Sequence, residues 1–401
     1  MNNQSHETAY RWYILTLAAL THTVTVAIPT MCMPVLFKEI SEDLGLSLVQ
    51  IGSIWGFMAF PALFTSLGGG IISDRLGTRR TLMLGCLLAG ITGALRGFSH
   101  DGITLGVTVF AFGMIRSVIP MTVHKTCGVW FSSRQLGLAN GTVSMGMALG
   151  FTVGSLISAT FLSPWLGGWR HVLFFYGIMS ILFSLLWFFS KSPETDPQTS
   201  SEDRPAASLR QTLFHVGSIK AVWLLGIAIL AIGGCIQGIL GYLPLYLRGI
   251  GWTDGAADGA LAAFHGISMI CTIPFAFWSD RLGSRKRALM AATILTIIGG
   301  TLLAVVDGPP VWLAVLLTGC VRDGFMAVFM TLIIEIRGIG AAYAGTAIGL
   351  IMSFSGLGNL LAPPIGNSLA AIAPGLPFIC WTGLALIGLL SLYLVKNDGI
   401  M

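Results

Sequence analysis

The chain has 401 residues, of which 54% are hydrophobic and only 10% are charged. Soluble domains carry about 25% charged residues, so this composition excludes a water-soluble globular protein, which could not bury so much apolar surface. The net charge of +5 does not indicate a nucleic-acid partner, because the basic residues lie in short segments beside apolar runs. Since a spanning helix needs roughly 20 mostly apolar residues, the chain is predicted to cross the lipid bilayer many times.

Apolar runs bounded by Gly, Pro and charged residues predict the spans in chain order. The first half is expected to hold helices over residues 12–37, 48–72, 81–98, 103–126, 136–161 and 171–190. The second half is expected to hold helices over 219–247, 257–278, 288–306, 310–334, 341–369 and 375–395. The run from Ile14 to Leu36 is too long for a cleavable signal peptide and is predicted to be the first span. The predicted fold class is therefore an all-α integral membrane protein with 12 transmembrane helices.

The longest polar stretch separates the two sets of helices at residues 191–218. It is rich in Pro, Ser, Thr and charge and has no apolar period, which predicts a solvated linker. A short surface helix is expected within it, near Leu209 to His215. The predicted organisation is an N-terminal six-helix bundle over 1–190, a cytoplasmic linker over 191–218 and a C-terminal six-helix bundle over 219–401.

Lysine and arginine are distributed unevenly between the two predicted sides of the membrane. Sixteen of them lie on the side of both termini, two lie within spans, and four lie on the opposite side: Lys38, Arg96, Arg170 and Arg248. Positive charge is concentrated on the cytoplasmic side of membrane proteins. Both termini are therefore expected in the cytoplasm, at a bacterial-type inner membrane.

An internal repeat relates the two halves. Residues 73–77 read SDRLG and recur at 279–283, while residues 113–116 read GMIR and align with GCVR at 319–322. Both matches have the same offset of 206 residues. They predict two parallel, pseudo-symmetric bundles related by an axis along the membrane normal, with a binding site between them near the midplane.

The loop after the second predicted span, residues 70–80, reads GIISDRLGTRR. It resembles the signature G-x-x-x-D-[RK]-x-G-x-[RK]-[RK] of the major facilitator superfamily of secondary transporters, and the second copy is degenerate because Ala276 replaces the first Gly. The resemblance implies a conformational latch on the inner face that stabilises the outward-open state, formed by Asp74, Arg75, Gly77, Arg79, Asp280 and Arg281. The alternative is that these arginines only set the topology.

Arg116 and Arg322 are the strongest indication of the substrate. Each lies about thirteen residues into its span, or roughly 20 Å from the outer end. A charge at that depth costs at least about 2.5–3.5 kcal/mol, so it usually faces a cavity. Because arginine offers a bidentate fork to carboxylate, nitrate or phosphate, the two side chains are predicted to bind an anion from both sides. The alternative is a proton relay or helix pairing.

Adjacent helical residues point in different directions, so Asp323 is not expected to neutralise its neighbour Arg322 directly. Other intramembrane side chains predicted to contact substrate are His265, Gln237, Tyr242, Trp55 and Asn359. For each of these, a satisfied buried polar group or an interfacial aromatic is the alternative. The first span lacks a carboxylate, so the candidates for proton coupling are Asp323, His265 and His22.

Several short segments narrow the resemblance. Residues 134–141, 167–170, 335–340, 343–347 and 363–366 resemble the cyanate and nitrate/nitrite permease branch and related organic-anion carriers. The predicted function is secondary active transport of a small inorganic or organic anion by alternating access. The alternatives are a proton-coupled multidrug efflux pump of the same fold and, in another class, a non-transporting membrane receptor.

An enzymatic function is not expected, because no nucleophile–base pair, P-loop or metal-ligand cluster stands out. The seven cysteines lie in or beside apolar runs at spacings that do not indicate a metal or redox pair. The expected partners are a small-molecule substrate and the bilayer. No cofactor, metal ion or obligate protein partner is expected.

Overall fold

The computed structural model describes residues 2–61, 64, 72–73, 75–191 and 209–395. The helices of the first half are α1 (Asn2–Thr21), η1 (His22–Ala27), α2 (Ile28–Leu44), α3 (Leu48–Ala59), α5 (Thr78–Leu95), η2 (Arg96–Phe98), α6 (Gly102–Trp130), α7 (Ser133–Ile157), η3 (Ser158–Leu162), α8 (Ser163–Leu166) and α9 (Trp169–Phe189). Those of the second half are α10 (Leu209–Ser218), α11 (Lys220–Gly249), α12 (Asp254–Arg281), α13 (Arg285–Val305), α14 (Pro310–Gly319), α15 (Arg322–Ile334), α16 (Gly340–Ser368), η5 (Leu369–Ala371) and α17 (Leu376–Leu394).

These helices follow the predicted spans closely. In the part of the chain that the structure describes, eleven helical segments are long and apolar enough to cross a membrane, and the first runs without interruption from Tyr10 to Leu44 through α1, η1 and α2. The remaining predicted span, the second in chain order at 48–72, begins with the shorter apolar helix α3. Most of the rest of this span lies outside the described residues. The expected all-α membrane fold is confirmed.

Local sequence explains where several helices begin and end. Gly45 adopts a left-handed conformation with φ 63° and ends α2. Ser47 and Gln50 then form a capping box that starts α3, and Asp101 with Thr104 forms another that starts α6. The first span also contains a π-helical segment, η1, immediately after Thr21. Such segments are rare and occur frequently at functional sites.

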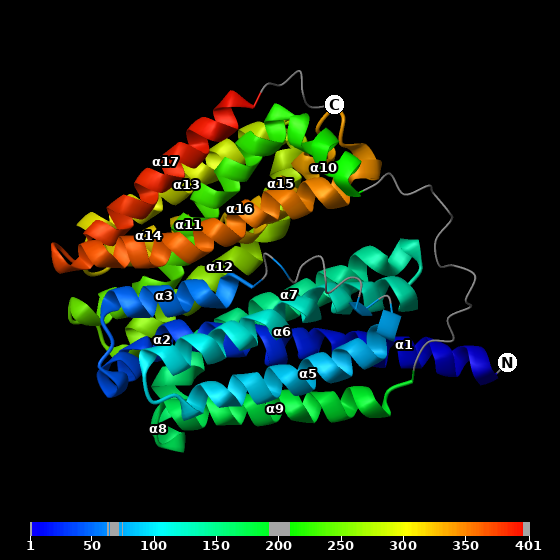
Figure 1. Cartoon of the computed structure of the whole chain (residues 1–401), viewed down its shortest axis with the longest axis horizontal. Coiled ribbons are helices and arrows are strands. Elements are labelled where there is room, and N and C mark those ends of the chain that lie inside the picture. The colour runs from blue at the N-terminus through cyan, green and yellow to red at the C-terminus, as the bar shows by residue number, and fades with distance from the viewer. Residues whose placement is uncertain (1, 62–63, 65–71, 74, 192–208, 396–401) are drawn as a thin grey trace.

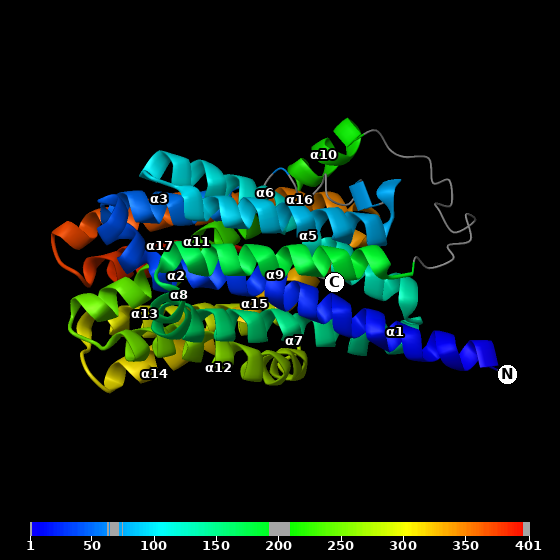
Figure 2. The same ribbon diagram turned by 90° about the horizontal axis from the view of Figure 1, so that it is seen from below.

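The helices of the two halves form two groups that lie against each other (Figure 1). We call the end where α2, α11 and α16 terminate at Leu44, Gly249 and Ser368 the distal end. The opposite end, where α9 ends and α10 begins, is the linker end, and Figure 2 shows it from a second direction. Contacts between the groups are made by α3 with α16, α7 with α12, and α2 with α11.

The internal repeat is visible in the packing of glycines against backbone. A Cβ added to Gly113 on α6 would lie 2.5 Å from the carbonyl oxygen of Met58 on α3. A Cβ added to Gly319 on α14 would lie 2.6 Å from the carbonyl oxygen of Phe264 on α12. Both the glycines and their partners are separated by the same 206 residues. The repeated sequence therefore makes the same close helix–helix contact in each half.

We predict that Gly113→Ala destabilises the protein by about 1–3 kcal/mol, the usual cost of overpacking, because α3 must move away from α6. Gly383→Ala on α17 is the matched control, since nothing lies within 4 Å of a Cβ added there. Thermal unfolding in detergent should show a lower midpoint for Gly113→Ala alone. Equal midpoints for the two variants would contradict this contact.

Candidate functional site

Arg322 lies at a break in a transmembrane helix. The span predicted as one helix over 310–334 is divided, because α14 ends at Gly319 and α15 begins at Arg322. The first amides of a helix have no intrahelical partner, and a helix N-terminus carries partial positive charge. The break therefore adds this positive end to the guanidinium of Arg322 inside the membrane span.

Arg322 is paired with its own neighbour in sequence. Its Nη1 donates to Asp323 Oδ1 at 2.7 Å, and its guanidinium carbon lies 5.2 Å from the ring of Phe151 on α7. The expectation that Asp323 does not neutralise Arg322 is therefore wrong. The angular spacing of a continuous helix does not apply, because Arg322 is the first residue after the break and its long side chain can bend back.

A cavity of about 190 Å³ lies beside Arg322 in the second half. Its polar lining comes from Arg322, Gln237, Asn359, Ser355 and Thr296, and apolar side chains of α11 and α15 form most of the remaining wall. Three residues predicted to contact substrate, Arg322, Gln237 and Asn359, thus line the same space. The combination of a few polar groups with a mostly apolar wall is typical of small-molecule sites.

Arg116 lies in the other half, on α6, and has a second arginine nearby. Its side chain is half-buried, and its Nε has no hydrogen-bond partner among the described residues. Arg96, at the end of α5, was expected at the outer side but is completely buried. Its Nη1 donates to the carbonyl of Pro29 at 3.0 Å, and its guanidinium lies 4.1 Å from the ring of Phe112. Sequence reasoning missed Arg96 because this residue stands at the end of an apolar run, where a residue of an exposed loop is expected.

The other predicted substrate residues lie elsewhere. Trp55 Nε1 donates to the Gln237 backbone carbonyl at 2.8 Å and so joins the two halves. Tyr242 donates to the Pro374 carbonyl at 3.1 Å and packs within an aromatic cluster. His265 is buried between the rings of Phe264 and Phe151, without a hydrogen-bond partner for either ring nitrogen. Trp55 and Tyr242 therefore pack towards the distal end, away from the cavity.

A family model described as Major Facilitator Superfamily matches residues 15–337. The chain belongs to this superfamily. It is 23% identical over 349 residues to a probable sulfoacetate transporter of Cupriavidus necator, covering 81% of this chain and 80% of the relative. It is 25% identical over 308 residues to a probable nitrate/nitrite antiporter of Thermus thermophilus, and the match covers 73% of this chain and 67% of that relative. The expected membership of the superfamily is confirmed, and its relatives include anion transporters.

Solved structures of the superfamily share this fold. A bacterial homologue of the human lysosomal transporter Spinster superposes with a TM-score of 0.75 at 16% identity. The comparison covers 96% of this chain and 94% of that protein. At this low identity the likeness concerns the architecture alone, and it agrees with the helix pairing described above.

The residues of the superfamily signature make contacts within each half. Gly77 has φ 78° and precedes α5, and Arg79 donates to the backbone carbonyls of Trp187 and Phe188 at the end of α9. In the second half, Arg285 forms two ion pairs. Its Nη1 lies 2.9 Å from Asp280 Oδ1, and its Nε lies 2.6 Å from Glu335 Oε1. The side chains of Arg75 and Arg281 are exposed, and Asp74 lies outside the described residues. The latch stays a prediction for these positions.

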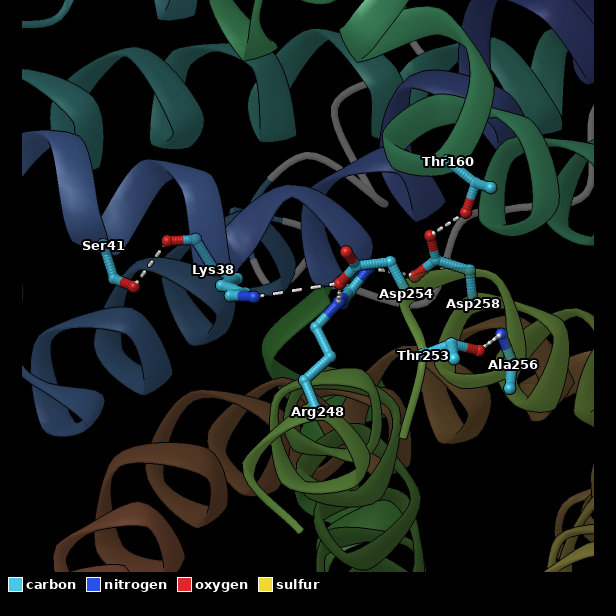
Figure 3. A network of polar contacts seen from close by, with 8 residues as sticks. All are labelled: Lys38, Ser41, Thr160, Arg248, Thr253, Asp254, Ala256 and Asp258. Atoms are coloured by element: carbon cyan, nitrogen blue, oxygen red, sulfur yellow. Dashed lines mark hydrogen bonds and ion pairs between the residues drawn. The ribbon is translucent and has the colours of Figure 1, made fainter. Parts of the chain in front are cut away.

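A network of charges closes the distal end of this superfamily member (Figure 3). Asp258 on α12 is completely buried and accepts from Arg248 Nη2 at 2.5 Å. Its other oxygen accepts from Thr160 Oγ1 of the first half at 2.6 Å. Arg248 also bonds Asp254 at 2.7 Å, and Lys38 of the first half lies 3.9 Å from Asp254. Arg248 was expected at the membrane surface, but this ion pair holds it inside.

The buried carboxylate of Asp258 needs these bonds, because charge inside a protein is stable only when it is paired and hydrogen-bonded. Thr160 and Lys38 supply the partners that cross from one half to the other. Asn367 adds a further crossing bond, donating to the Leu48 carbonyl at 2.8 Å. Separating the halves here removes all three contacts.

We predict that Thr160→Val weakens closure of the distal end, because a hydrogen bond to a charged group contributes about 1.5–3 kcal/mol, equivalent to roughly tenfold or more in the closed population. The amides of η3 and of the first turn of α12 should exchange hydrogen faster by mass spectrometry. Thr142→Val is the matched control, because Thr142 lies on the same membrane span, Gln135–Leu166, and its hydroxyl donates to the Leu138 carbonyl one turn earlier. Unchanged exchange in Thr160→Val would show that this bond does not hold the halves together.

Proposed function

We propose that this protein is a secondary active transporter that moves a small anion across the cytoplasmic membrane by alternating access. The observation that carries the proposal is the position of Arg322, at the start of a broken helix and beside a cavity. A guanidinium inside a membrane span costs free energy, so such a residue usually has a function. Its five N–H donors suit planar oxyanions, and its hydrogen bond to Asp323 uses one of them.

The helix break supports the same substrate chemistry. In secondary transporters, half-helix N-termini point at anionic groups of the substrate near the bilayer midplane. Here the start of α15 and Arg322 together supply such an end. Asp323 holds the guanidinium while no substrate is bound, and an anion competes with that carboxylate for the same donors. Arg116 in the first half supplies the second positive charge when the halves enclose the substrate.

The wall of the cavity favours an organic anion over a bare inorganic one. Its volume of about 190 Å³ is about six times the volume of a water molecule in the liquid, more than one oxyanion head fills. The apolar side chains around it suit a short carbon skeleton, while Gln237 and Asn359 offer hydrogen bonds for a second polar group. A carboxylate or sulfonate substrate fits this lining, in line with the sulfoacetate transporter among the relatives.

The contacts at the distal end suit one state of the transport cycle. If both termini lie in the cytoplasm, the distal end faces outward and the Asp258 network closes the outer side. The structure then corresponds to an inward-open state. The signature residues of the linker end act in the opposite, outward-open state.

We predict that Arg322→Gln and Arg116→Gln each lower uptake of sulfoacetate or nitrate into proteoliposomes. Loss of a charged hydrogen bond of about 1.5–3 kcal/mol corresponds to roughly a 10- to 150-fold loss of affinity. The control is Arg287→Gln, which removes the same charge from an exposed side chain at the linker end. Transport at the full rate by both Arg322→Gln and Arg116→Gln rules out the paired-arginine site.

A further inference from the structure

Two histidines face each other inside the first half of the molecule. His22, the first residue of the π-helical segment η1, is 1% exposed, and neither of its ring nitrogens has a hydrogen-bond partner. Its ring centre lies 6.0 Å from that of His124 on α6, in an edge-to-face arrangement. A neutral imidazole carries one N–H donor and one acceptor, and the Val143 backbone of α7 is the polar group beside the ring that can take the donor, so at least the acceptor nitrogen is buried without a partner. Such a group calls for a functional explanation.

His124 is oriented by a polar partner on a neighbouring helix. Its Nδ1 lies 3.0 Å from Asn140 Oδ1 on α7, which fixes the orientation of the ring. The side chain of His124 is half-buried rather than buried. On α7, a Cβ added to Gly137 or Gly141, on either side of Asn140, would meet nothing within 4 Å. His124 is therefore the more accessible member of the pair.

Packing holds His22 in this place. Thr23 Oγ1, next to it on η1, donates to the Gly146 carbonyl of α7 at 2.7 Å. Thr21, on its other side, accepts from Trp187 Nε1 of α9 at 2.9 Å. The π-helical segment is thus bonded to two neighbouring helices on either side of His22. These bonds fix the backbone that carries His22 opposite His124.

The one carboxylate among the candidates for proton coupling, Asp323, is paired with Arg322. A second buried carboxylate, Asp258, is paired with Arg248. Within the membrane spans of the first half, the acidic side chains that the structure describes lie at the distal end of α2, at Glu39, Glu42 and Asp43. His265 is buried against aromatic rings, next to the helix that begins with the Arg322 cation. A proton there would place a second positive charge beside the first.

We propose that His22 and His124 together bind the proton that is coupled to anion transport. The proposal rests on the proposed function and names its coupling ion and coupling site. One proton binds a ring nitrogen of the pair as the anion binds at the arginines, and both leave on the same side, so no other reactant is needed. His124 lies two turns from Arg116 along α6, roughly 12 Å, so the charge on the pair favours an anion at Arg116.

The groups around the two histidine rings are mostly uncharged, so the charge of the pair changes when it binds or releases the proton. From α7 the facing groups are the Asn140 amide and the backbone of Val143, and from α9 the Trp187 indole reaches Thr21. From α5 the Cys86 thiol faces Thr25 of η1. Among the described residues, no carboxylate faces the two rings. The pair is expected to bind one proton at a time, because two would repel each other.

The test uses the full-length protein in proteoliposomes with the membrane potential clamped at zero. Radiolabelled sulfoacetate and nitrate are the two separate probes. An outside pH one unit lower than the inside raises the steady-state accumulation ratio about tenfold for one proton per anion. Exchange of labelled for unlabelled anion at equal pH measures transport that needs no proton gradient. The variants are His22→Gln and His124→Gln, with exposed His171→Gln on α9 as the matched control.

We expect wild type and His171→Gln to accumulate the probe about tenfold, while His22→Gln and His124→Gln retain exchange but reach a ratio close to one. Because replacing buried His22 can disturb folding, half-buried His124 is the deciding position, and retained exchange shows that its variant is folded. Full accumulation by His124→Gln overturns the proposal. Wild-type exchange without accumulation also overturns it but leaves anion transport intact. A wild-type protein that exchanges neither probe contradicts the proposed function instead.

Discussion

The cost of holding a charge away from water determines much of this structure. Arg248 and Asp258, both inside the protein, are stable only as a pair, and Asp258 obtains its last hydrogen bond from the opposite half. Arg322 is held by Asp323, and Arg96 by backbone carbonyls and an aromatic ring. Arg116, by contrast, is bonded to no carboxylate among the described residues, and its Nε has no hydrogen-bond partner there. Most of the buried charges thus stabilise the present arrangement, while Arg116 is left for a ligand.

The fold could be predicted from the sequence because each span must be apolar over a length set by the bilayer. The repeat was equally informative, since it aligned the two arginines and also aligned Gly113 with Gly319, which make matching contacts in the structure. Composition also placed the polar segment between the two sets of helices. These features are local or periodic, so they need no knowledge of which helices touch.

The site could be predicted only in part, because its geometry depends on a helix break and on contacts between distant segments. Arg322, Gln237 and Asn359 were found from their polarity inside spans, yet the pairing of Arg322 with Asp323 was missed. That error came from assuming a continuous helix through Cys320 and Val321. The Arg248–Asp258 pair has a sequence signal, since both residues flank one short turn, but the bond from Thr160 has none. His124 has none either, because nothing along the chain shows that it meets His22.

The close glycine contacts have a mechanical consequence. Where Gly113 meets the Met58 backbone and Gly319 meets that of Phe264, the paired helices touch without intervening side chains. Such contacts leave no soft layer that could deform or slide, so each group of helices behaves as a stiff lever. Rearrangement is then concentrated where the levers meet, along α3 with α16 and α7 with α12. A small rotation there is magnified over the length of the helices, and a few hydrogen bonds at one end govern the width of the opening at the other.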